Sequence, residues 1–319
     1  METNMNITEL KTAAVSGALD ENFAACGIAA GKIPAYRTRV INAADEFIRL
    51  YDNDSKRDVY LFSVGGRSEI SGNHTDHNHG KVIAGSVNLD VIAVAAANSD
   101  GTVRVKSEGF PEDTVLPSAV GAPDESKFFT SAAIIAGMEN AFLSGGRKIG
   151  GFDAYTTSNV LKGSGLSSSA AFEVMIGNIL NHIYNNGAVD NVTIAKMAQF
   201  AENSFFGKPC GLMDQTACAV GGLVTIDFAD PTAPVIEKLD FDLSAAGYSL
   251  CIVNTGGNHA DLNEDYASVP TEMKSVAAAL GKTVLRESCE DELIAHTAEI
   301  REKCGDRAFL RAMHFYAEN

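Results

Sequence analysis

The residue types best suited to chemistry lie in residues 161–173, which read LKGSGLSSSAAFE. Gly163 and Gly165 let the backbone come close to a ligand. The small apolar residues after the serines indicate the start of a buried helix, whose N-terminal N–H groups and positive dipole end attract anions. The segment therefore predicts a phosphate-binding loop.

A magnesium site is predicted at the start of the same helix. If the helix begins near Leu166, Ser169 and Glu173 stand four residues apart on one face. A hydroxyl and a carboxylate so placed suit Mg²⁺, which prefers oxygen ligands and usually binds together with substrate phosphates. The pair therefore indicates a nucleoside triphosphate with Mg²⁺.

Two better-known glycine loops are excluded. A Walker loop has Lys and then Ser or Thr after its second glycine, where this chain has Leu166. The dinucleotide fingerprint needs a third glycine at the position that Ser168 occupies. For this segment taken alone, a Gly/Ser-rich loop that only caps a core helix remains the alternative.

Size and charge limit the classes of protein to consider. The chain has 319 residues, a formal net charge of −16 and 45% hydrophobic residues. This length exceeds the size at which one core usually stops growing, so two domains are expected. The acidic balance argues against nucleic acid or an anionic membrane as a partner. We expect no secretory signal and no membrane span, because no segment has the required apolar pattern.

The six cysteines are scattered without a C-x-x-C pair. Neither a disulfide framework nor a structural zinc site is therefore expected. A reducing cytoplasm is the simplest compartment for this pattern.

Apolar periodicity predicts an α+β architecture, because strands and helices do not alternate regularly. The Ser-Asp-Gly turn at residues 99–101 predicts a hairpin between the strands on either side of it. We expect helices over residues 7–52 (interrupted at Pro34), 126–142, 166–184, 192–206 and most of 264–319, and strands over 59–64, 82–97, 102–105, 152–160, 223–228, 248–254 and near Thr283.

A second candidate site segment, residues 66–80, reads GRSEISGNHTDHNHG. Arg67 could screen phosphate charge, and His74 and Asp76 could hydrogen-bond hydroxyl groups. The H-x-D-H-x-H pattern also admits a metal site. A solvated polar loop is the simplest alternative.

Two further segments place polar residues after apolar ones. Residues 207–222 read GKPCGLMDQTACAVGG, in which Asp214 is a lone acid. A buried carboxylate is unfavourable unless it is paired or functional, although an ordinary helix cap also explains it. Residues 254–266 read NTGGNHADLNEDY and suggest either one wall of a site or a loop that leads into a capped helix.

Together these segments resemble galactokinases, within the larger family of GHMP small-molecule kinases. The matching stretches, in the family's order, are GRSEISGNHTDHNHGKVIAGSV, GSGLSSSAA, CGLMDQ and TGGNHADLNEDYASVP. The resemblance runs from about Val64 to the end of the chain. It implies an α+β fold of two domains, with mixed and antiparallel sheets packed with helices and the active site between the domains. We expect a helical lead-in over residues 1–60, an N-terminal domain over 61–210 and a partial C-terminal domain over 211–319.

The resemblance also implies roles for individual residues. Asp214 falls on the catalytic aspartate, and Arg67 falls on the arginine beside it. The implied sugar ligands are Asn73, His74, Asp76, Gly211 and Tyr266. The implied ATP-binding residues are Gly163, Ser164, Gly165, Leu166, Ser167, Ser168 and Ser169, and the implied Mg²⁺ ligands are Ser169 and Glu173.

Several positions depart from the family pattern. Asn73 stands where a glutamate that contacts the sugar's outer hydroxyl is usual, and Glu69 stands where asparagine is usual. His77 replaces a tyrosine and Leu161 replaces a proline. The family's third, glycine-rich motif does not occur before Asn319. We therefore expect a chain that is truncated relative to the family, with little or no activity.

The sequence favours an ATP-dependent sugar 1-kinase that converts galactose and ATP into galactose 1-phosphate and ADP. Asp214 would orient or deprotonate the anomeric hydroxyl, and Arg67 would offset charge on the transferring group. Two alternatives stay open. One is the same reaction on a related sugar such as N-acetylgalactosamine, and the other is a non-catalytic regulator that binds sugar and ATP on the same fold.

Overall fold

The computed structural model describes residues 5–51, 57–117, 120–160, 163–243, 245–253 and 263–319, with side chains in the last range from Ala267. The chain divides into two compact units. Unit 1 comprises Met1–Gly66, Val87–Leu161 and Ser167–Ala219, and unit 2 comprises Arg67–Ser86, Lys162–Leu166 and Val220–Asn319. The domain limits expected from the sequence stay predictions.

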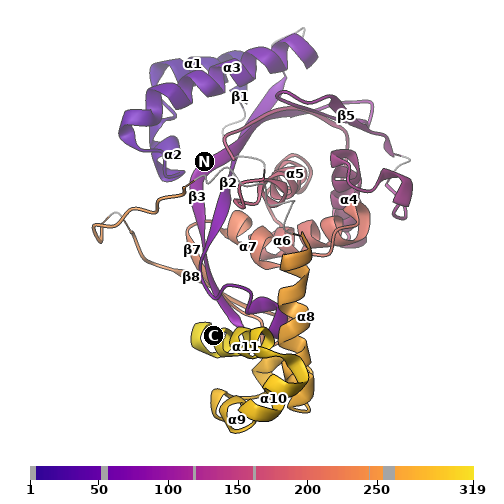
Figure 1. Ribbon diagram of the computed structural model, residues 1–319. Helices are drawn as coiled ribbons and strands as arrows, with labels where there is room; N and C mark the ends of the chain where they lie inside the picture. The colour runs from indigo at the N-terminus through magenta and orange to yellow at the C-terminus, as the bar shows by residue number, and fades with distance from the viewer. Residues whose placement is uncertain (1–4, 52–56, 118–119, 161–162, 244, 254–262) are drawn as a thin grey trace. The chain divides into compact units, whose positions relative to one another are not determined.

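A mixed sheet forms the frame of unit 1, with the strand order β1-β2-β3-β6-β4-β5 (Figure 1). Strand β6 pairs antiparallel with β3 and parallel with β4. All of its residues except the last are buried, as expected for a central strand. The strands are β1 (Met5–Asn6), β2 (Asp58–Ser71), β3 (Lys81–Ala97), β4 (Val103–Ser107), β5 (Glu112–Val115) and β6 (Phe152–Ser158).

The hairpin predicted at residues 99–101 is wrong. The turn itself forms, since Asp100 accepts a hydrogen bond from the Thr102 N–H at 2.9 Å. However, β4 pairs with β5 and β6 and not with β3. The buried strand β6 takes the position between β3 and β4, so burial outweighs the local turn signal.

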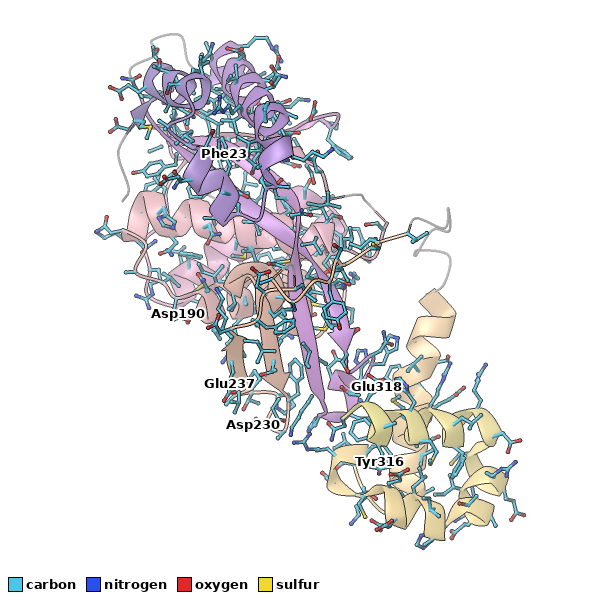
Figure 2. All side chains as sticks on the ribbon, turned by 90° about the vertical axis from the view of Figure 1, so that its left-hand side faces the viewer. Phe23, Asp190, Asp230, Glu237, Tyr316 and Glu318 are labelled. Carbon is cyan, nitrogen blue, oxygen red and sulfur yellow. The ribbon has the colours of Figure 1, made fainter. Side chains whose placement is uncertain are left out.

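Three N-terminal helices, α1 (Ile7–Ser16), α2 (Asp20–Ala25) and α3 (Ile33–Tyr51), pack on one face of this sheet (Figure 1). Figure 2 labels Phe23 of α2 within their shared apolar cluster, which also contains Ile92, Val94 and Ala96 of β3. The predicted interruption at Pro34 is wrong in detail. Pro34 lies in the first turn of α3, where its missing N–H leaves no hydrogen bond unmade.

A buried carboxylate fastens α3 to the sheet. Asp90 of β3 accepts hydrogen bonds from Arg39 and from the Tyr36 hydroxyl. A second nitrogen of Arg39 donates to the carbonyls of Asp90 and Thr157 at 2.9 and 2.8 Å. Desolvation and the Asp90 charge raise the pKa of Tyr36, so the phenol stays a donor.

Three of the remaining helices of unit 1, α4, α5 and α6, confirm the helices predicted over residues 126–142, 166–184 and 192–206. Two features have no counterpart in the prediction. One is the short helix α7, and the other is a π-helical turn, η5 (Ala201–Phe206), which continues directly from α6. The helices are α4 (Ser131–Ser144), α5 (Ser168–Asn185), α6 (Asn191–Phe200) and α7 (Met213–Val220).

Unit 2 combines the beginning of β3 with β7 (Leu223–Asp227) and β8 (Val235–Leu239), all antiparallel. Its helices share an apolar core that includes Met273, Leu285 and Phe315. They are α8 (Asn263–Ala279), α9 (Glu290–Ala295), α10 (Thr297–Cys304) and α11 (Asp306–Glu318). Short 3₁₀ turns are η1 (Ala30–Lys32) and η4 (Glu125–Lys127) in unit 1, and η2 (Asp76–Asn78) and η7 (Leu285–Glu287) in unit 2.

Two strands predicted in unit 2 are wrong. Residues 248–253 form no strand and expose Tyr248 and Val253 by 66% and 78%. An apolar run without a pairing partner does not make a stable strand. The segment near Thr283 leads into η7, because the Thr283 side chain and N–H bond Glu287 four residues later. In the part of the chain described here, we find no helix long and apolar enough to cross a membrane.

Candidate active site

The predicted phosphate loop leads directly into α5. This helix begins at Ser168, two residues later than expected from the sequence. Gly163 and Gly165 both have φ of 75°, and Ser167 has φ of 56°. A Cβ at Gly165 would meet no atom within 4 Å, so the left-handed backbone, and not crowding, is the reason for glycine there. The loop thus ends at the N-terminus of an 18-residue helix, where anions are favoured.

Arg67 lies against this loop within unit 2. Its backbone N–H donates to the Leu166 carbonyl at 3.1 Å. Its Nη1 donates to the Gly165 carbonyl at 2.6 Å. These residues are about a hundred positions apart in the sequence, and the structure brings the Arg67 guanidinium to the glycine loop. The catalytic role of Arg67 stays a prediction.

Asp214 lies in the first turn of α7 in unit 1. The Ser167 hydroxyl donates a hydrogen bond to Asp214 Oδ2. The last residue of the phosphate loop and the predicted catalytic carboxylate are therefore in direct contact. Leu212 anchors this segment in the core, and Gly211, a predicted sugar ligand, is exposed.

Two buried carboxylates, Glu173 and Glu202, are bridged by Gln215, the residue that follows Asp214. Glu173 is fully buried on α5, and its Oε2 accepts a hydrogen bond from Gln215 Nε2 at 3.1 Å. The same nitrogen donates to Glu202 Oε2 at 2.7 Å. Lys208 in turn donates to Glu202 Oε1 at 2.9 Å. One amide thus bridges two carboxylates that come from α5 and from the π-helical turn η5.

Burial and the neighbouring Glu202 carboxylate raise the pKa of Glu173 well above its usual range. Glu173 Oε1 and Gln215 Oε1 are buried without a hydrogen-bond partner in the described part of the chain. Glu202, Lys208 and Gln215 are not among the site residues predicted from the sequence. The available signal was a charged residue inside the apolar helical run QFAENSFF.

The predicted sugar-binding segment forms a tight loop in unit 2. His74 has φ of 64°, which is rare for a residue with a side chain. Its ring stacks on His77 with centroids 6.1 Å apart. Burial and the nearby His77 lower the pKa of His74, which favours a neutral imidazole. Asp76, two residues after His74, begins the 3₁₀ turn η2.

Two departures from the family pattern meet in this loop. Asn73 Nδ2 donates to Glu69 Oε2 at 3.4 Å, a long hydrogen bond. The amide and the carboxylate, each unusual at its own position, are thus neighbours. In the described residues, no group of three or more His, Cys, Asp or Glu side chains is placed to hold a metal ion, and the histidines of this loop are no exception.

The third predicted wall of the site lies largely outside the described residues. His259 and Asp261 fall in residues 254–262, and Leu161 also lies outside the description. Tyr266 is in α8, but its side chain is not among those described.

Comparison with known proteins identifies the family. Residues 131–222 match the model of the GHMP kinases N terminal domain, and residues 45–97 match the galactokinase galactose-binding signature. The galactokinase of Lactobacillus helveticus is 32% identical over 286 residues, which are 86% of this chain and 71% of that protein. This chain belongs to the galactokinase family.

Other galactokinases are matched over less of their length. The enzyme of Streptomyces coelicolor is 32% identical over 257 residues, 79% of this chain and 64% of its own. The chain therefore spans less than two thirds of that relative. The crystal structure of Lactococcus lactis galactokinase complexed with galactose shares the fold, with a TM-score of 0.68, 22% identity and coverage of 86% of this chain and 70% of that one.

Proposed function

We propose that this galactokinase-family chain transfers the γ-phosphoryl group of ATP to the anomeric hydroxyl of galactose. In that reaction the anomeric oxygen forms a bond to the γ-phosphorus, and the bond from phosphorus to the β-phosphate oxygen breaks. The hydroxyl proton passes to a base, and ADP leaves. Such transfers depend mainly on positioning and on electrostatic stabilisation.

The observation that carries this proposal is the contact between Ser167 and Asp214. It holds a carboxylate at the point where a glycine loop meets a helix N-terminus. A phosphate bound at that terminus would lie next to a group able to accept a proton. Ser167, by donating to Oδ2, fixes the orientation of the Asp214 carboxylate.

Arg67 supports the same proposal through charge. Its guanidinium donates to the Gly165 carbonyl, so it is held at the glycine loop. There it would offset negative charge on the transferring phosphoryl group.

Ser169 and Glu173 are the residues that would hold Mg²⁺. Both belong to the first turns of α5, one turn apart, as the sequence argument requires. The donors are hard oxygens, and Glu173 Oε1 has no partner in the described structure, so the set fits a magnesium ion. A bound Mg²⁺ would neutralise phosphate charge. The buried Gln215 amide, which also donates to Glu202, orients the Glu173 carboxylate.

A coupled assay for ADP release tests the activity, with galactose, glucose, mannose and N-acetylgalactosamine as acceptors in the presence of Mg²⁺ and ATP. Among these acceptors we expect turnover with galactose, at the low level predicted from the sequence for this chain. Turnover only with N-acetylgalactosamine would keep the chemistry and change the sugar. Binding of sugar and ATP without ADP release, for every acceptor, would favour the non-catalytic regulator.

A further inference from the structure

The end of helix α11 contacts the loop that carries His74 and Asp76. Glu318 Oε2 accepts hydrogen bonds from the Gly72 N–H at 2.8 Å and from the Ser71 hydroxyl at 3.1 Å. His314, one turn earlier, donates from Nε2 to the Asn73 carbonyl at 2.8 Å. Figure 2 labels Glu318 where α11 reaches the ends of the strands on either side of this loop.

The loop is closed at its base by its own residues. The buried Thr75 hydroxyl lies within donating distance of two carbonyl oxygens, those of Gly72 and Lys81, at 2.8 and 2.5 Å. Gly72 has φ of 92°, and a Cβ there would lie 2.3 Å from the Lys81 carbonyl oxygen. The base is therefore fixed, whereas the Gly72 N–H and the Asn73 carbonyl need partners from elsewhere.

Those partners come from the helical part of unit 2. Besides Glu318 and His314, the buried Asn78 accepts the Leu285 N–H at 3.3 Å, and the Tyr316 hydroxyl of α11 donates to the Leu285 carbonyl at 3.2 Å. The Gly72 N–H, the Ser71 hydroxyl and the neighbouring His314 all lower the pKa of Glu318, the Gly72 N–H most. The Glu318 carboxylate is thus engaged in its charged form, which makes strong hydrogen bonds.

We propose that α11 sets the geometry of the sugar-binding loop, with Glu318 and His314 as positioning residues for sugar recognition. The proposal rests on the proposed function for the identity of the ligand. The residues on either side of His74 in the chain, Asn73 and Thr75, are held by α11 and by the loop base. The strained backbone of His74 persists because these neighbours are fixed.

The expected effect is on binding and not on chemistry. Without Glu318 the loop samples more conformations, and sugar binding must then order it again. Such a loss acts equally on the ground state and the transition state, so KM for sugar rises while kcat is unchanged. Glu318 is proposed to contact only the loop and not the reacting atoms, so its loss is expected to leave proton transfer unchanged.

Hydrogen exchange with mass spectrometry tests the proposal without reference to activity. In Glu318→Ala, the peptide covering residues 71–82 is expected to exchange about 10-fold faster, for the loss of a charge-assisted hydrogen bond. Glu318→Gln, which keeps an acceptor, is expected to restore most of the protection. Glu302→Ala, an exposed position on α10, is the matched control and leaves this peptide unchanged.

Galactose titration by calorimetry is the second readout. Glu318→Ala and His314→Ala are each expected to weaken galactose binding by about 10-fold, with ATP binding unaffected. Unchanged exchange in residues 71–82 overturns the proposal, whatever the activity of the chain. Faster exchange with unchanged galactose affinity overturns the recognition role. If the unsubstituted chain binds no sugar at all while the exchange result holds, the proposed function fails and the support of the loop by α11 stands.

Discussion

Replacing Ser167 tests whether its contact with Asp214 contributes to phosphoryl transfer. Both Ser167→Ala and Ser167→Gly remove the hydroxyl that donates to Asp214 Oδ2. They differ in the backbone, because Ser167 has φ of 56° and only glycine adopts this conformation without strain. Comparing the two variants therefore separates the effect of losing the hydrogen bond from the effect of backbone strain.

The magnitudes follow from these two features. A hydrogen bond to a charged acceptor contributes about 1.5–3 kcal/mol. If that contribution is made in the transition state, its loss lowers kcat by about 10- to 100-fold. A left-handed conformation costs an alanine about 1–2 kcal/mol more than a glycine, so we expect Ser167→Gly to unfold at a higher temperature than Ser167→Ala.

The assay is steady-state ADP release together with thermal unfolding. Asn186 provides the matched control, since it ends the same helix with φ of 54° and is 19 residues from Ser167 in the chain. Asn186→Gly is expected to raise thermal stability without changing kcat. If both Ser167 variants keep the kcat of the unsubstituted chain, the contact with Asp214 has no catalytic role. If only the alanine variant loses activity, the backbone and not the hydroxyl is responsible.

Further expectations concern four other parts of the structure. Asp214→Asn is expected to lower kcat by about 10²–10⁴-fold with galactose affinity within a few-fold, and a variant that keeps its kcat would make Asp214 a structural carboxylate. Glu173→Gln is expected to raise the Mg²⁺ concentration for half-maximal turnover, and an unchanged Mg²⁺ titration contradicts its role as a ligand. Burial raises the pKa of Glu139 from 4.5 to about 8. Between these two pH values the folded state keeps a proton that the unfolded state releases, so the free energy of unfolding falls as the pH rises from 4.5 to about 8. Glu139→Gln is therefore expected to stabilise the protein by about 2 kcal/mol at pH 8 and hardly at pH 4.5, and an equal shift in melting temperature at both pH values would refute this. Asn73→Glu places a second carboxylate beside Glu69 and is expected to destabilise the protein by about 1 kcal/mol. The double variant E69N/N73E exchanges the two side chains and is expected to restore stability, and a double variant as unstable as Asn73→Glu would show that the two side chains do not interact.

Local sequence patterns predicted the elements that position the site. The glycines and serines before α5 indicated its start within two residues, because a left-handed glycine turn is a property of a few neighbouring residues. The i,i+4 relation of Ser169 and Glu173 required only that the segment be helical. The roles of Arg67 and Asp214 were implied by the resemblance to galactokinases and not by spacing, and their contacts with the loop join residues that are distant in the chain.

The features that the sequence did not reveal depend on contacts over long distances in the chain. Glu202 joins the site because a π-helical turn directs it toward Gln215, and no local pattern distinguishes that turn from α-helix. The position of β6 between β3 and β4 depends on burial of a whole strand. Likewise, the link between Glu318 and Gly72 joins residues 246 positions apart.

The packing of α3 on the sheet bears on how shortened forms of this protein should be designed. The galactose-binding signature begins at residue 45, inside α3, so a gene fragment cut at that family boundary would encode only the last third of the helix. Such a cut would remove Arg39 and Tyr36. The Asp90 carboxylate would then lose the guanidinium and the phenol hydroxyl that donate to it. The same cut would expose an apolar sheet surface to solvent, which promotes aggregation during expression. Without the N-terminal helices α1, α2 and α3, the sheet residues exposed to solvent would be Val59, Ile92, Val94, Ala96 and Tyr155. Shortened forms should therefore retain the chain from α1 onward.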